Sequence, residues 1–156
     1  GFLSLQAYRF AHHLWVRQRH CLARYLGMQA SKVFDVDIHP AAVLGKGIML
    51  DHATGIVIGE TAKIGDNVSL LHGVTLGGSG NQSGQRHPTV ENGVMISCGS
   101  KVLGNIRLGN GVKVGGGSLV LADVEDHMTV VGVPARVVGK AGHDAPALFM
   151  DQDFSN

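Results

Sequence analysis

Aromatic residues and cysteines are scarce in this sequence. Aromatic side chains account for 5% of its 156 residues, so aliphatic side chains have to fill any core. The two cysteines, Cys21 and Cys98, stand alone rather than in Cys-x-x-Cys pairs. This spacing argues against a disulfide framework and against a zinc knuckle, and we expect a reducing, cytoplasmic environment.

The sequence also has little net charge and no long apolar run. Its formal charge is +1, so the overall charge does not point to nucleic acid or to an anionic membrane as a partner. No run approaches the roughly 20 apolar residues of a membrane-spanning helix, and no signal-peptide pattern opens the chain. We therefore expect neither a nucleic-acid partner nor a membrane partner.

Aliphatic residues recur every six positions between residues 90 and 125. This period fits neither a helix, with 3.6 residues per turn, nor a simple alternating strand. A six-residue repeat is typical of a parallel β-helix, in which each hexad supplies one short strand and one corner and three hexads make one coil. The side chains expected to point inward and stack are Val90, Ile96, Val102, Leu108, Val114 and Val120.

The repeat starts before residue 40 and is interrupted twice. It slips by two positions at Thr54–Gly55, which predicts a bulge or a widened corner. It stops altogether over residues 77–89, a glycine- and serine-rich stretch that ends in Arg86, His87 and Pro88. Loops that leave a rigid scaffold often carry function, so the charged end of this loop is a candidate site.

The ends of the chain have different patterns. Residues 2–30 have apolar residues at helical spacing, and Gly27 is a plausible end of that helix. The sequence therefore predicts an all-β protein with an N-terminal helix. Its predicted parts are a helical segment at 1–34, a β-helix at 35–125 with an inserted loop at 77–89, and a closing turn, strand and tail at 126–156.

Several short runs stand out against the repeat. They are Asp37-Ile-His-Pro, Asp51-His-Ala-Thr-Gly, Gly73-Val-Thr-Leu-Gly-Gly, Arg86-His-Pro and Gly132-Val-Pro-Ala-Arg. Together they closely resemble bacterial serine O-acetyltransferase, of the hexapeptide-repeat acyltransferase superfamily, and the likeness continues into Asp151-Gln-Asp-Phe. The resemblance implies a left-handed β-helix, against the usual right-handed crossover rule.

The same resemblance implies an assembly and partners. Members of the family form trimers with active sites between adjacent chains, and their full-length form is a hexamer. They carry a helical domain before the position of Leu5, and a tail ending in isoleucine that docks into cysteine synthase. This chain starts at the last helix of that domain and ends at Asn156, so we expect a shortened or processed form that lacks the docking tail.

The resemblance also implies the chemistry. Acetyl passes directly from acetyl-CoA to the hydroxyl of L-serine, with no acyl-enzyme and no metal, and L-cysteine inhibits at the serine site. His52 is the implied general base, and Asp37 would accept its other ring N–H. Asp51 would bind the substrate ammonium, Arg86 the α-carboxylate, and His87 would hydrogen-bond near the hydroxyl.

The implied acetyl-CoA groove runs along a coil edge between two chains. Cys98 and Gly116 occupy equivalent positions one coil apart, where the family usually has alanine, so the groove should stay open. The remaining histidines, including His39 and His72, are expected to be structural or solvated. The residues expected to line the groove are Gly77, Gly78, Cys98, Gly99, Lys101 and Gly116.

The residues of the sequence leave three other functions open. A γ-type carbonic anhydrase would use three of the nine histidines to hold zinc. An acetyltransferase acting on a sugar or an antibiotic would share the scaffold and a histidine base. A non-catalytic β-helix would serve as a scaffold or as a regulator of cysteine synthesis.

Overall fold

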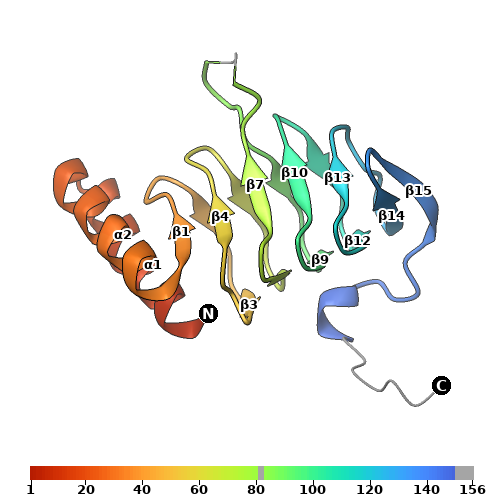
Figure 1. Ribbon diagram of the computed structural model, residues 1–156, viewed down its shortest axis with the longest axis horizontal. Helices are drawn as coiled ribbons and strands as arrows, with labels where there is room; N and C mark the ends of the chain where they lie inside the picture. Colours follow the sequence, from red (N-terminus) through yellow and green to blue (C-terminus); the bar gives the residue numbers. More distant parts are fainter. Residues whose placement is uncertain (81–82, 150–156) are drawn as a thin grey trace.

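The computed structural model describes residues 1–80 and 83–149. Two helices precede a left-handed parallel β-helix, which confirms the fold predicted from the six-residue repeat (Figure 1). Residues 81–82 of the predicted loop and residues 150–156 of the predicted tail, including the run from Asp151, lie outside the described residues. Within the described part, no helix is long and apolar enough to cross a membrane.

The N-terminal segment forms two helices, not the single helix predicted for residues 2–30. α1 (Phe2–Val16) and α2 (His20–Phe34) are joined through Gln18, whose backbone is left-handed with a φ of 60°. Gly27 lies inside α2 and does not end it, because its role is packing. A Cβ on Gly27 would lie 3.6 Å from Cγ of Pro40, so the glycine lets α2 approach the first coil. Helical spacing alone does not reveal a left-handed turn at a glutamine.

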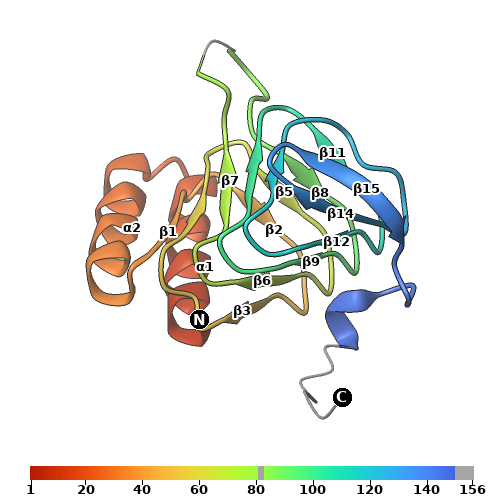
Figure 2. The same cartoon turned by 45° about the vertical axis from the view of Figure 1, so that its right-hand side comes forward.

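Three sheets form the sides of the coils, and all their strand pairs are parallel except β14 with β15 (Figure 2). The first sheet contains β1 (Val36–Ile38), β4 (Ile56–Ile58), β7 (Thr75–Gly77), β10 (Lys101–Leu103) and β13 (Leu119–Val120). The second contains β2 (Val43–Leu44), β5 (Lys63–Ile64), β8 (Thr89–Val90) and β11 (Arg107–Leu108). The third contains β3 (Met49–Asp51), β6 (Ser69–Leu71), β9 (Met95–Ile96), β12 (Lys113–Val114), β14 (Met128–Gly132) and β15 (Ala135–Lys140).

The C-terminal end of the β-helix closes with a hairpin. β14 runs parallel to β12, and β15 then pairs with β14 in the antiparallel sense. A short 3-10 helix, Pro146–Leu148, follows and packs against the third sheet, where Ser69 Oγ donates to the carbonyl of Ala147 at 3.2 Å.

Coil length varies where the repeat is interrupted. β10 and β13 pair with an offset of 18 residues, which is three hexads. β1 and β4 pair with an offset of 20, so the first coil holds two extra residues, as the slip at Thr54–Gly55 predicted. β7 and β10 pair with an offset of 26, because the loop before β8 adds eight residues and projects from the end of β7 (Figure 1).

The core is a stack of aliphatic side chains inside the coils. The six residues predicted to point inward are each at most 2% exposed. Burying a side chain of this size contributes about 1.5–3 kcal/mol, so the stack supplies a rigid support for the corners. The residues are Val90, Ile96, Val102, Leu108, Val114 and Val120.

Candidate functional site

The corner between β3 and β4 exposes a histidine beside a carboxylate. His52 and Ala53 both have left-handed backbones, with φ values of 55° and 62°, at the place where the first coil gains its extra residues. Non-glycine residues seldom adopt this conformation, so the flanking strands have to hold the turn. The His52 side chain is 78% exposed, and its Nε2 lies 3.9 Å from Oδ1 of Asp51.

A second histidine lies one coil further along the same edge. The His72 ring meets the His52 ring edge to face, with centroids 6.1 Å apart and an angle of 86° between the planes. The two corners are joined by a backbone hydrogen bond of 2.8 Å from the N–H of Gly73 to the carbonyl of Thr54. We refer to Asp51, His52 and His72 as the corner group.

The edge that carries the corner group continues through most of the predicted acetyl-CoA residues. The carbonyl of His72 accepts a 2.9 Å hydrogen bond from the N–H of Gly99 on the next coil. A Cβ on Gly116 would lie 3.5 Å from Sγ of Cys98, so these two positions are stacked as predicted. The Lys101 ammonium is exposed and lies 3.5 Å from the carbonyl of Gly99.

The loop after β7 brings a second set of polar side chains together. Arg86 Nη2 donates to Oε2 of Glu60, and this hydrogen bond lowers the pKa of the Glu60 carboxyl. Arg86 Nη1 donates to the carbonyl of Gly84 at 3.4 Å. We refer to Glu60, Thr61, Arg86 and His87 as the loop group.

Thr61 fastens the loop to the corner after β4. Its Oγ1 accepts from the backbone N–H of Arg86 at 3.0 Å and from that of His87 at 3.1 Å. The Gln85 amide donates to the carbonyls of Thr61 and His87, at 2.7 and 2.8 Å. The His87 side chain is therefore held in place, and the residue is only 9% exposed. Burial, with the nearby Arg86 charge, lowers the pKa of His87.

His39 connects the loop group to the helices. Its Nδ1 accepts from the N–H of Ala41 at 3.1 Å, and its ring meets Trp15 edge to face with centroids 5.1 Å apart. Burial lowers the pKa of His39, and the Glu60 carboxylate opposes this shift. His39 thus has a structural contact, as predicted, but it also lies within electrostatic range of the loop group.

Asp37 lies apart from His52 within one chain. It is exposed on β1, where its backbone pairs with Val57, and it lines a cavity of about 340 Å³ beneath α2 together with Arg24 and Lys32. Among the described residues no hydrogen bond or ion pair joins Asp37 to His52. The residue nearest to the His52 ring as an ion-pair partner is Asp51.

The corner group and the loop group lie at opposite ends of the first sheet. Asp51 and His52 precede β4 and His72 precedes β7, whereas the loop group follows β4 and β7 (Figure 1). The three residues of such a strand already span about 10 Å. Gly78 belongs at the loop end, because a Cβ there would lie 3.4 Å from Nε2 of His87, and Gly77 ends β7 beside it.

Sequence reasoning gave no role to two residues of the loop group, Glu60 and Thr61. Both follow the Asp51-His-Ala-Thr-Gly run closely, but their partners Arg86 and His87 are 26 residues away. Only the excursion of the loop back to the β4 corner reveals these contacts. The signal in the sequence was the carboxylate of Glu60 followed by the hydroxyl of Thr61, directly after a predicted strand, where side chains can reach a neighbouring loop.

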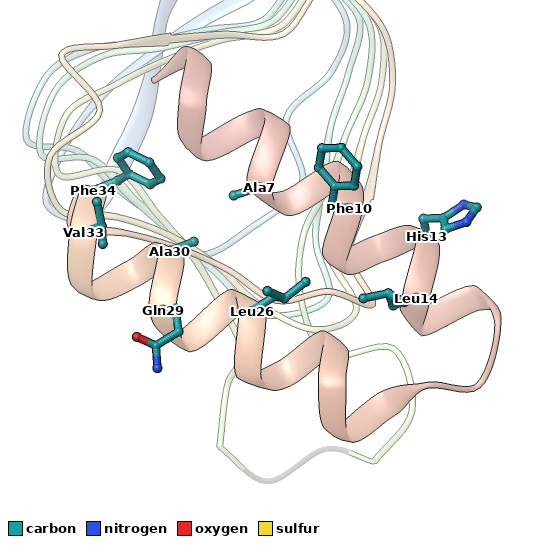
Figure 3. Close-up of a pocket in the computed structure, with 9 residues that line it drawn as sticks. All are labelled: Ala7, Phe10, His13, Leu14, Leu26, Gln29, Ala30, Val33 and Phe34. Atoms are coloured by element: carbon teal, nitrogen blue, oxygen red, sulfur yellow. The ribbon is translucent and has the colours of Figure 1, made fainter.

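A larger apolar cavity lies elsewhere, between the two helices. It has a volume of about 450 Å³ and contains no member of the corner or loop groups (Figure 3). In residues 1–80 and 83–149 there is no cluster of three or more histidine, cysteine or carboxylate side chains arranged to hold a metal ion. The lining residues are Ala7, Phe10, His13, Leu14, Leu26, Gln29, Ala30, Val33 and Phe34.

Comparison with known proteins gives a consistent result. No family model matches the chain. The serine acetyltransferase of Salmonella typhimurium is 59% identical over 155 residues, which cover 99% of this chain and 57% of that protein. A solved serine acetyltransferase in complex with cysteine superposes with a TM-score of 0.94 at 55% identity, over 99% of this chain and 60% of the other.

A solved serine acetyltransferase of Neisseria gonorrhoeae, in complex with serine, superposes with a TM-score of 0.86 at 55% identity. It covers 89% of this chain, and 57% of the gonococcal chain is matched. The chain thus spans somewhat more than half the length of the relatives it matches. Over that length the chain is similar, in sequence and in fold, to serine acetyltransferases, which is consistent with the hexapeptide-repeat acyltransferase family.

Proposed function

We propose that this chain transfers acetyl from acetyl-CoA to the hydroxyl of L-serine, giving O-acetylserine and CoA. The observation that carries the proposal is the exposed imidazole of His52 beside Asp51, on a β-helix 59% identical to a serine acetyltransferase. That identity favours serine over a sugar or an antibiotic as acceptor. It also favours acetyl transfer over carbonic anhydrase activity or a purely structural role.

In the proposed reaction His52 acts as the general base. The serine hydroxyl attacks the thioester carbonyl carbon, a C–O bond forms and the C–S bond to CoA breaks. The hydroxyl proton passes to His52 and then to the departing CoA sulfur. Because serine itself attacks the thioester, no acyl-enzyme forms. An imidazole suits this task because its ordinary pKa is near 6.5. Asp37 is proposed to accept the other ring N–H of His52 and to stabilise the imidazolium.

Serine is proposed to bind between the carboxylate of Asp51 and the guanidinium of Arg86. Asp51 would accept from the substrate ammonium. Arg86 has five N–H donors, and its contacts with Glu60 and Gly84 use two of them, so three remain for the α-carboxylate. His87 would lie near the hydroxyl. L-cysteine has the same ammonium and carboxylate, so we propose that it competes for this site and inhibits.

The proposed site needs groups from both ends of the first sheet. An amino acid as short as serine does not reach from His52 to Arg86 in one chain, because the strand between them spans about 10 Å. A neighbouring copy that presents its loop group to the corner group would complete the site. We therefore propose a homotrimer with a site at each interface, which agrees with the resemblance to the family.

The proposed acetyl-CoA groove follows the same interface. Cys98, Gly99, Lys101 and Gly116 lie along the edge that carries His52. Gly77 and Gly78 lie at the other end of the first sheet, beside the loop group. Their lack of a side chain would let the protein backbone approach the pantetheine arm of acetyl-CoA. A cytoplasmic location completes the proposal for this chain, and the hexamer and the cysteine synthase complex are proposed only for a full-length form with the helical domain and the docking tail.

The test is an acetyl-transfer assay. The chain is mixed with acetyl-CoA, and free thiol is followed with L-serine present and then absent. Thiol release that depends on serine and is blocked by L-cysteine supports the proposal and locates both amino acids in one site. If no serine-dependent release occurs, even after the chain is extended to the length of its relatives, the proposal is refuted.

A further inference from the structure

The hydroxyl of Thr61 has a fully determined hydrogen-bond role. A threonine hydroxyl has one O–H donor and two acceptor lone pairs. The backbone N–H groups of Arg86 and His87 both donate to Oγ1, at 3.0 and 3.1 Å, and occupy the two lone pairs. The O–H is therefore left to donate, and the acceptor within reach is Nδ1 of His87 at 2.8 Å.

The same ring nitrogen receives a second donor. The backbone N–H of Thr61 donates to Nδ1 of His87 at 3.2 Å. A proton on Nδ1 would face both this N–H and the Thr61 O–H. A neutral imidazole carries one proton, so in this setting the proton belongs on Nε2.

The Nε2 end of the ring lies on the side away from Thr61. It lies against two glycines, because a Cβ on Gly59 would overlap Cδ2 and Nε2, and one on Gly78 would lie 3.4 Å from Nε2. Within the described residues, Nε2 has no protein partner, and the single unpartnered and fully buried side-chain polar atom is Nδ1 of His127. Nε2 of His87 therefore keeps some solvent contact, and its N–H is not used by another group of the described chain.

We infer that Thr61 is a positioning residue that holds His87 as a neutral imidazole with its proton on Nε2, so that His87 serves the bound substrate as a hydrogen-bond donor and not as a base. With Nδ1 saturated by donors and Nε2 protonated, the ring has no free lone pair. This inference rests on the proposed function. It assigns the Nε2–H of His87 to the hydroxyl oxygen of serine and leaves proton removal to His52.

The groups around His87 agree with this assignment. Burial and the adjacent Arg86 cation disfavour a second proton on the ring. Among the described residues Glu60 favours it, but its carboxylate is paired with Arg86. Thr61 and Gln85 are uncharged. The ring therefore stays neutral at neutral pH.

Nitrogen NMR of the ring tests the inference without relying on activity. Chain labelled with ¹⁵N-histidine is recorded in two-bond proton–nitrogen correlation spectra at neutral pH, and His87 is assigned by its loss in His87→Gln. We expect the pattern of an Nε2-protonated ring. A proton on Nδ1, or fast averaging between the two tautomers, would overturn the inference.

Two substitutions at Thr61 test the role of the hydroxyl. Thr61→Ser keeps the O–H and should keep the His87 spectrum and kcat/KM for serine within about threefold. Thr61→Val removes it, so the Nε2-protonated pattern should give way to a mixture of the two tautomers, and kcat/KM should fall roughly 10- to 100-fold. Thr89→Val, on a strand with no side-chain hydrogen bond among the described residues, is the control.

The outcomes separate this inference from the proposed function. If Thr61→Val leaves both the tautomer pattern of His87 and kcat/KM unchanged, the inference is wrong. An Nε2-protonated His87 in a chain without acetyl transfer would refute the proposed function and leave the role of Thr61 standing. If Thr61→Val does not fold, the tautomer in the unaltered chain still decides.

Discussion

Replacing Gly59 with alanine should displace His87 without altering its chemistry. Gly59 follows β4 directly, and the His87 ring lies against it. A Cβ at this position would overlap Cδ2 and Nε2 of His87, well inside the 3.0 Å that real Cβ contacts essentially never cross. The φ of Gly59 lies outside the left-handed region, so alanine is acceptable to the backbone and the effect comes from the clash alone.

The size of the effect follows from the displacement. Carbon atoms in contact lie about 3.5–4.0 Å apart, so the ring has to move by more than about 1 Å. A misplacement of about 1 Å can lower a rate by roughly 100-fold. Overpacking of this kind also costs about 1–3 kcal/mol of folding free energy, unless the loop moves away with the ring.

The assay is serine-dependent thiol release from acetyl-CoA, with kcat/KM for serine as the readout. Gly139→Ala is the matched control, because a Cβ on Gly139 in β15 meets nothing within 4 Å. We expect a loss of about 100-fold in Gly59→Ala and no change in Gly139→Ala. Thermal unfolding of both variants shows whether the fold is retained.

One result would refute the reasoning. If Gly59→Ala keeps its fold and a kcat/KM within threefold of the unaltered chain, the position of the His87 ring against Gly59 does not matter for the reaction. The role of His87 in binding serine would then have to be abandoned.

Three further predictions concern the other groups of the site. His52→Ala should lower kcat by roughly 10²–10⁴-fold, the usual range for loss of a general base, and a variant within threefold of the unaltered chain would remove His52 from that role. Arg86→Ala should weaken serine binding more than it lowers kcat, because the α-carboxylate of serine loses the guanidinium that binds it. An unchanged apparent serine affinity in steady-state kinetics would contradict this role of Arg86. The pKa of His87 is lowered in the folded chain, so the unfolded chain takes up a proton first as the pH falls. The contribution of neutral His87 to the free energy of unfolding is present above about pH 6.5, and it is lost as the pH falls towards the pKa of His87 in the folded chain. His87→Gln should therefore reduce the decline in denaturant stability below pH 6.5, and an identical decline in both proteins would count against this.

Much of the fold could be predicted from the sequence because the repeat is local. Each hexad contributes one inward side chain, and Val102 or Leu108 is buried for the same reason as its neighbours six residues away. Even the widened first coil could be predicted, since a two-residue slip in a strict period has to appear as extra chain at one corner. The break between α1 and α2 could not, because helical spacing continues across Gln18.

The arrangement of the candidate site could be predicted from the sequence to a lesser extent than the fold. His52, Arg86 and His87 were found by their motifs, but the motifs do not say how the residues are arranged. That the corner group and the loop group lie at opposite ends of the first sheet follows from the direction of β4 and β7 within a coil. The contact proposed between Asp37 and His52 has no counterpart within one described chain and stays a proposal.

The sequence by itself determined the repeat, the position of the loop and the residue types available for chemistry. Only the tertiary structure decided which of these residues touch. Thr61 and His87 lie 26 residues apart, and the loop folds back to join them. The protonation of the His87 ring then depends on two hydrogen-bond donors that meet at one nitrogen atom. A pattern along the chain records spacing, whereas a tautomer depends on distances of about 3 Å between groups that are remote in the chain.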